Sequence, residues 1–140
     1  MLAVKAYPQD YIDDCRSRMD AQLAAYEAVR SSASPAGDAA IGSFEPLFLN
    51  DLVLVLDQYF VHRTRAIEGK DGNPLNEVRM LCGSILHDEG ILSPDKTIKY
   101  TPETSVLKLG IGDEIRLDVA QFRQLCEAFF TEIERRFTAS

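Results

Sequence analysis

A wide apolar stripe runs between residues 44 and 68 and limits the folds open to this chain. Apolar side chains recur there every three or four positions: Phe48, Leu49, Leu52, Val53, Val55, Leu56, Tyr59, Phe60, Ala66 and Ile67. This spacing is the period of an α-helix, and a stripe this wide indicates a helix that is buried over much of its surface. Ser43 can cap its start, and Gly69 can end it. The sequence therefore predicts a central helix over residues 44–68.

Two further helices follow the same reasoning. Asn73 and Pro74 are typical of a helix start and Gly90 of a helix end, which predicts a helix from residue 74 to about residue 89. Asp118 has Gln121 three positions later, the pattern of a capping box. Apolar residues then recur at helical spacing up to residue 137. The last helix therefore has a strongly apolar face.

Short runs with the pattern of β-strands lie between these two helices. They are TIKY (97–100), SVLKL (105–109) and EIRL (114–117), separated by the turn-forming sequences TPET and GIGD. The expected fold class is mainly α (α+β). We expect a small helical bundle with a three-stranded antiparallel meander before the C-terminal helix.

The N-terminal part differs in composition from the remainder. A narrow apolar stripe predicts a first helix up to Arg30: Ile12, Cys15, Met19, Leu23, Tyr26 and Val29. The sequence SSASPAGDAAIGS (31–43) is small and polar, which is typical of a flexible linker. We therefore divide the chain into an N-terminal helical arm (1–30), a flexible linker (31–43) and a single globular domain (44–140).

Charge and cysteine usage exclude several classes of protein. The net charge of -7 opposes nucleic-acid binding, and no apolar run reaches the roughly 20 residues of a membrane helix. The N-terminus lacks the apolar segment of a signal peptide. The three cysteines, Cys15, Cys82 and Cys126, are dispersed, which fits reduced thiols in the cytoplasm. With only His62 and His87, no metal motif is present, and no phosphate or dinucleotide motif predicts a cofactor.

The densest polar stretch, residues 59–81, contains the candidate ligand-binding residues. These are Tyr59, His62, Arg63, Lys70, Asp71 and Glu77. Arg63 falls within the apolar stripe, and burying a guanidinium without a partner costs several kcal/mol. We expect it to be buried and paired with Asp71, Glu77 or carbonyl groups at a helix end. An ion pair that holds two helices together is the simpler interpretation, and an anion site is the alternative.

The stretch FLNDLVLVLDQYFVHRTRAIEGKDGNPLNEVRMLCGS resembles a family of small bacterial proteins, mostly actinobacterial, that are described only as uncharacterised. The resemblance covers about residues 44–137. It implies no activity, cofactor or site residue.

Two functions from different classes follow from these patterns. The first is a non-enzymatic, self-associating interaction or scaffold protein, because the apolar faces of the first and last helices exceed what one small core can bury. It predicts a homodimer formed mainly by the first helix, or binding to a different protein partner. The second is a binder of small anionic ligands or an enzyme, with its site at the Arg63–Asp71 helix corner. No catalytic residue is identified.

Overall fold

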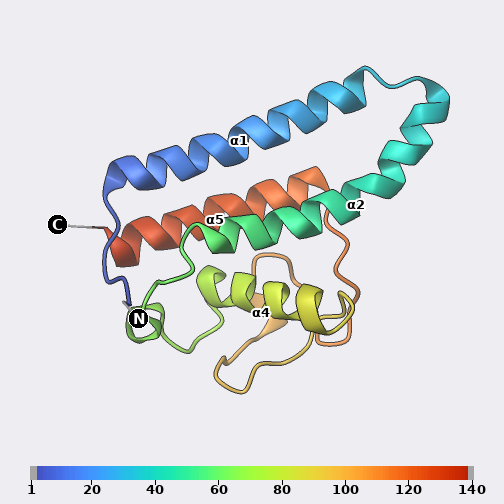
Figure 1. Cartoon of the computed structure of the whole chain (residues 1–140). Coiled ribbons are helices and arrows are strands. Elements are labelled where there is room, and N and C mark those ends of the chain that lie inside the picture. The colour runs from blue at the N-terminus through green and yellow to red at the C-terminus, as the bar shows by residue number, and fades with distance from the viewer. Residues whose placement is uncertain (1–2, 139–140) are drawn as a thin grey trace.

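A computed structural model describes residues 3–138, which form helices joined by loops. The α-helices of this range are α1 (Gln9–Ser31), α2 (Pro35–Gln58), α3 (Arg65–Glu68), α4 (Pro74–His87) and α5 (Val119–Phe137), with one 3₁₀ helix, η1 (Pro102–Thr104). Figure 1 shows α1 and α2 as a long hairpin, with α5 running alongside and α4 beneath α2 and α5. Helix α5 contacts each of the other α-helices. It is therefore the centre of the core.

The predicted starts of α4 and α5 are confirmed. The Asn73 side chain caps α4 by accepting hydrogen bonds from the N–H groups of Leu75 and Asn76. Asp118 and Gln121 cap α5 reciprocally: Asp118 Oδ1 accepts from Gln121 N at 2.8 Å, and Gln121 Oε1 accepts from Asp118 N at 3.1 Å. Both caps satisfy N–H groups that have no partner inside their helix.

The core is made of the apolar faces of α5, α4 and the second half of α2. Helix α5 contributes Phe122, Leu125, Phe129, Phe130, Ile133 and Phe137, all fully buried. Phe60, just beyond α2, contacts the rings of Tyr7, Phe129 and Phe130. Each large apolar side chain buried in this way stabilises the fold by about 1.5–3 kcal/mol.

Helix α1 packs against its own chain. Its stripe is buried: Ile12, Cys15, Met19, Leu23 and Tyr26. Two ion pairs connect α1 to α5, with Arg16 Nη2 at 2.6 Å from Glu134 Oε1 and Arg123 Nη2 at 2.5 Å from Glu27 Oε1. Apart from Val29, the apolar stripe from which a homodimer was expected is therefore covered within the chain, as is the apolar face of α5.

The helix expected over residues 44–68 is displaced toward the N-terminus. Helix α2 begins at Pro35 because the Ser34 hydroxyl accepts a hydrogen bond from Gly37 N at 3.2 Å, and proline fits a first turn. The expected linker over 31–43 is correspondingly reduced, and residues 32–34 alone join α1 to α2. Pro46 lies inside α2, where it removes one helical hydrogen bond. Figure 1 shows that α2 is bent.

Helix α2 ends at Gln58 because tertiary hydrogen bonds take over the residues that follow. Val4 N donates to His62 O at 2.7 Å, and Thr64 N donates to Val4 O at 2.9 Å. These bonds hold residues 59–64 in a turn, after which α3 begins at Arg65. The apolar spacing that predicted one long helix therefore belongs to two helices.

The predicted three-stranded antiparallel meander is wrong. Residues 3–138 contain isolated β-bridges but no strand, and residues 88–118 form an irregular loop around η1. Apolar residues of the three runs enter the core singly: Ile98, Leu107, Ile115 and Leu117. The alternation of apolar and polar residues in these runs therefore comes from single apolar side chains that anchor a loop to the core. The fold is helical rather than α+β.

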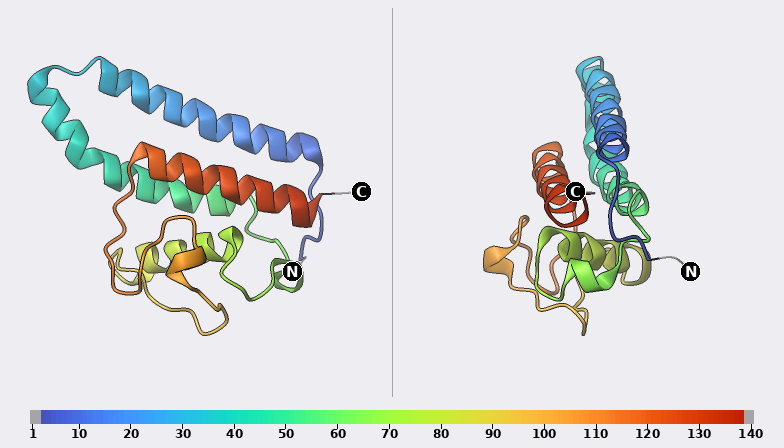
Figure 2. Two further views of the ribbon diagram at one scale, coloured as in Figure 1. Left: turned by 180° about the vertical axis from the view of Figure 1, so that it is seen from behind. Right: turned by 90° about the vertical axis from the view of Figure 1, so that its left-hand side faces the viewer.

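Polar side chains replace the hydrogen bonds that a sheet would have supplied to this loop. The buried Glu77 carboxylate accepts N–H groups of Val106 and Leu107 at 2.8 and 3.0 Å. On α2, Asn50 Nδ2 donates to Ile115 O at 2.6 Å, and Asn50 Oδ1 accepts from Leu117 N at 3.3 Å. The loop is thus fixed to α4 at one point and to α2 at another. Figure 2 shows it covering the side of α4.

Candidate functional site

Arg63 is buried at the corner between α2 and α4, as the sequence predicted, with 3% of its surface exposed. Its Nε lies 3.2 Å from Glu68 Oε2, and its Nη2 lies 2.9 Å from Asp57 Oδ1. Its remaining donors reach main-chain carbonyls, Phe60 O at 3.1 Å and Leu75 O at 3.3 Å. The expected pairing with Asp71 or Glu77 is wrong, whereas the pairing with carbonyl groups at a helix end is confirmed.

Glu68 is the acid around which this corner is built. Its side chain is fully buried and lies within ion-pair distance of the guanidinium groups of Arg63, Arg65 and Arg79. Burial by itself would raise the pKa of the Glu68 carboxyl, but the hydrogen bonds from Arg79 and the charges of the arginines lower it below its usual value. Glu68 therefore stays ionised in the interior.

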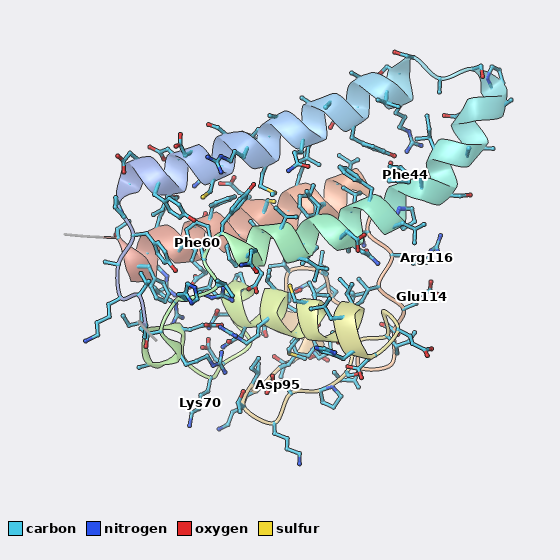
Figure 3. All side chains as sticks on the ribbon, viewed as in Figure 1. Phe44, Phe60, Lys70, Asp95, Glu114 and Arg116 are labelled. Atoms are coloured by element: carbon cyan, nitrogen blue, oxygen red, sulfur yellow. The ribbon has the colours of Figure 1, made fainter. Side chains whose placement is uncertain are left out.

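The corner does not gather the other candidate residues into one site. His62, Lys70 and Asp71 are exposed, and Tyr59 is half-buried. Figure 3 shows Lys70 at the periphery, pointing away from the ribbon. Glu77 is buried, but it binds the loop through Val106 and Leu107 and does not face Arg63. The arrangement forms a closed ion cluster whose donors are directed at internal acceptors.

Exposed apolar side chains also occur away from this corner, at the end of the α1–α2 hairpin. We call residues 26–48 the hairpin end: the last turns of α1, the joining residues and the first half of α2. No residue between 27 and 48 is buried. Val29, Phe44 and Leu47 are 59%, 51% and 65% exposed, which is unusual for large apolar side chains close together.

The hairpin end is nevertheless held in one arrangement. The rings of Tyr26 and Phe48 stack with centroids 5.3 Å apart, and those of Phe44 and Phe48 stack at 5.7 Å. The Tyr26 hydroxyl donates to Glu45 Oε1 at 2.6 Å, and Arg30 pairs with the same carboxylate. These contacts join α1 to α2. Figure 3 shows Phe44 in the angle between the two helices.

Two hollows flank the contact between α1 and α2 in this region. One, of about 730 Å³, is lined mostly by small residues: Ala28, Val29, Ser32, Ala33, Ser34, Gly37, Ala40 and Ile41. The other, of about 300 Å³, is mostly apolar: Gln22, Ala25, Tyr26, Val29, Ile41, Phe44 and Phe48. Val29 and Ile41 line both. The hairpin end therefore combines exposed apolar side chains with two open, shallow hollows.

Sequence reasoning missed this surface because the segment was interpreted as a linker. The signal that could have found it is Ser34 followed by Pro35, a capping residue before a proline at the first helical position. With the helix starting at Pro35, Phe44 and Leu47 are helical residues. They lie on a different face of α2 from the buried Leu49 and Leu56. Helix α2 is also apolar and long enough to cross a membrane, a test that buried core helices pass too.

Other recesses of the described chain have features that argue against a site. A groove of about 620 Å³ between α1 and α5 is crossed by the pairing of Arg16 with Glu127. A recess of about 190 Å³ beside α4 is lined by Arg79, which is already bound to Glu68. Within residues 3–138, no three His, Cys, Asp or Glu side chains are grouped to hold a metal ion.

Comparisons with protein-family models, with curated proteins and with solved structures found no match. The resemblance of residues 44–137 to a bacterial family therefore stays a prediction.

Proposed function

We propose that the protein is a non-enzymatic interaction protein, and that its hairpin end docks onto a protein surface. The observation that supports this proposal is a helical hairpin over residues 27–48 in which no residue is fully buried. Ordering a residue costs about 1–2 kcal/mol, and an isolated helix of this length is marginal in water. A partner that covers Val29, Phe44 and Leu47 would supply the missing burial.

The alternative function, an anionic-ligand site or enzyme at the Arg63–Asp71 corner, has less support. Arg63 already contacts two carboxylates, and Arg79 donates twice to Glu68. A ligand anion would have to displace a buried carboxylate from these groups, which costs several kcal/mol. Lys70 and His62 are exposed, and neither lines any of the four hollows described above.

We also propose that the protein acts in the cytoplasm. Cys15, Cys82 and Cys126 are free and buried, and burial raises the pKa of each thiol. A buried protonated thiol is inert and behaves as a small apolar side chain. These cysteines therefore fit a reducing compartment and support packing rather than chemistry.

Photo-cross-linking in the cells that make the protein tests the docking function. A photoreactive phenylalanine analogue at Leu47 is expected to form covalent adducts with protein. The same group at Leu86, which is 60% exposed on α4, is the matched control and is expected to form few. Equal adduct yields at the two positions, or none at Leu47, would argue against the proposed function.

A further inference from the structure

A short segment without helical structure precedes α1, and we call its residues 3–8 the strap. Figure 1 shows it running from the start of α1 past the C-terminal end of α5 toward the turn that follows α2. We propose that the strap is a lid over the buried ion cluster of Arg63 and Glu68, and that it opens and closes while the helices stay folded. This lid is independent of the docking function proposed for the hairpin end.

The strap is attached to the backbone on both sides of Arg63. Val4 forms a parallel β-bridge with Arg63. The Val4 N–H group donates to His62 O at 2.7 Å, and the Val4 carbonyl accepts from Thr64 N at 2.9 Å. Because one residue of the strap binds both neighbours of Arg63, release of the strap frees the turn that carries this guanidinium.

Two side chains anchor the strap, and one of them lies beside the cluster. Val4 is half-buried and Tyr7 is 8% exposed, whereas the other residues of the strap are exposed. The Tyr7 ring packs edge-on against Phe60 with centroids 4.8 Å apart, and Tyr7 N donates to Phe137 O. Burial raises the pKa of the Tyr7 hydroxyl to about 12, and the positive charge of Arg63 opposes this shift. The phenol is therefore close enough to the cluster to feel its charge.

The strap contains a weak point at the Tyr7 hydroxyl. This oxygen is buried and has no hydrogen-bond partner among residues 3–138. A buried polar group without a partner opposes burial, so the hydroxyl weakens the closed state of the strap. The Tyr11 ring stacks on Tyr7 at 5.8 Å, but its hydroxyl donates to Tyr59 O. A segment with two anchors, one of them imperfect, has the properties of a part that opens locally.

Opening of the strap changes the access to Arg63. The Arg63 side chain has no exposed surface when the strap is closed, and its partner Asp57, at 2.9 Å, is 19% exposed. Release of Val4 loosens the backbone around Arg63, and withdrawal of Tyr7 removes a ring that lies next to the cluster. Water and small reagents then reach the guanidinium. The lid therefore controls whether the charges of this corner are accessible.

Native-state hydrogen exchange of the full chain, followed by NMR, tests the opening. We expect the amides of Val4, Tyr7 and Thr64 to exchange together, about tenfold or more faster than the buried amides of α5. Urea up to about 1 M should change their rates little, because a local opening exposes little surface. If the three amides exchange as slowly as those of α5 and respond to urea as steeply, the strap opens only on global unfolding and the proposal is overturned.

Tyr7→Phe and Tyr11→Phe form a matched pair, because each removes one hydroxyl from two stacked rings. Tyr7→Phe is expected to slow exchange of the Thr64 amide about fivefold to tenfold, since it removes an unpaired buried group. Tyr11→Phe is expected to speed that exchange, since it removes a hydrogen bond to the turn. Unchanged or faster exchange in Tyr7→Phe would show that the hydroxyl does not weaken the closed strap, which overturns the proposal.

Modification of arginine by phenylglyoxal, mapped by mass spectrometry, tests what the lid covers. Val4→Pro removes the N–H group that binds His62 O, and Arg63 should then react about tenfold or more faster than in wild type. Arg116, whose side chain is 58% exposed, is the internal control and should react equally in both proteins. Val4→Ala keeps the N–H group and should show a smaller increase, which decides the question if Val4→Pro does not fold. An Arg63 that stays protected while the Thr64 amide exchanges fast overturns the proposal.

Discussion

Glu68 and Arg79 form a two-point ion pair in which the carboxylate is fully buried. Arg79 Nε lies 3.1 Å from Oε1 and Nη2 lies 2.7 Å from Oε2. The same carboxylate also contacts Arg63, which belongs to the turn after α2. One acid therefore connects α3, α4 and that turn, and its loss should be felt by all three.

The first prediction is that Glu68→Gln destabilises the protein by about 3–5 kcal/mol. The substitution keeps the shape of the side chain but leaves Arg63 and Arg79 without their shared anion, and breaking a buried pair on one side has this magnitude. Urea unfolding followed by circular dichroism measures it. Glu114→Gln is the control, because Glu114 pairs with Arg116 at an exposed position, and its effect should stay below about 1 kcal/mol. Similar losses in the two variants would argue against the buried cluster.

The second prediction separates packing from charge at Arg63. Its guanidinium lies over the Phe129 ring, with Cζ 5.5 Å from the centroid. Arg63→Ala removes both the stem and the charge, and we expect a loss of about 2–4 kcal/mol. Arg63→Met keeps most of the volume and should recover part of that loss. The unfolding free energies of the two variants, measured side by side, separate the contribution of packing from that of charge. An unchanged melting temperature for Arg63→Ala would contradict the burial of Arg63.

The third prediction concerns pH and Glu77. Burial raises the pKa of the Glu77 carboxyl above its usual value, although the N–H groups of Val106 and Leu107 oppose the shift. The folded state therefore binds this proton more tightly than the unfolded state. The contribution of Glu77 to stability is largest below the unfolded pKa of about 4.3 and falls as pH rises toward the folded pKa.

Glu77→Gln tests that sign. The variant cannot titrate at this position, and its NH₂ group faces a backbone donor, so we expect it to be about 1–3 kcal/mol less stable than wild type. The difference between wild type and variant should shrink as the pH rises from 4 to 7. Thermal unfolding at four or five pH values measures it. A difference that grows with pH would mean that the pKa is lowered instead.

The fourth prediction is that the hairpin end opens on its own. Ser34→Ala removes the cap of α2, which costs about 1 kcal/mol locally. Because no residue between 27 and 48 is fully buried, the global unfolding free energy should change little while amide exchange over residues 35–45 speeds up. Hydrogen exchange with mass spectrometry reports both. Limited proteolysis should cleave this segment before the loop over residues 88–118.

The sequence predicts helices well where the capping residues and the apolar stripe agree. Asn73 with Pro74, and Asp118 with Gln121, mark the starts of α4 and α5 correctly. Two serines could cap α2: Ser34, which precedes Pro35, and Ser43, which precedes Pro46. Ser34 is the cap, whereas Ser43 was expected. Local signals alone do not rank them. The prediction of the meander was wrong for a different reason. Apolar and polar residues alternate in a short strand, and they can alternate in the same way in a loop that buries single apolar side chains.

The candidate site was predicted in part. Arg63 lies in an apolar stripe, and its burial follows from that position. Glu68 was missed because the sequence predicted one continuous helix over residues 44–68, and on such a helix Glu68 lies away from the apolar stripe. The turn held by Val4 resets the helical phase before α3, so a single helical wheel no longer applies there. That turn depends on contacts with a segment about 60 residues away, which no local pattern encodes.

The pairing of α1 with α5 has a consequence for the speed of folding. Arg16 and Glu134 are 118 positions apart in sequence, and Gln9 donates to Glu134 across 125 positions. Helical proteins fold fast when their contacts are local, and the rate falls as contacting residues become more distant along the chain. Closing so long a loop must precede burial of the α1 stripe. This protein should therefore fold more slowly than helical bundles of similar size whose neighbouring helices are consecutive.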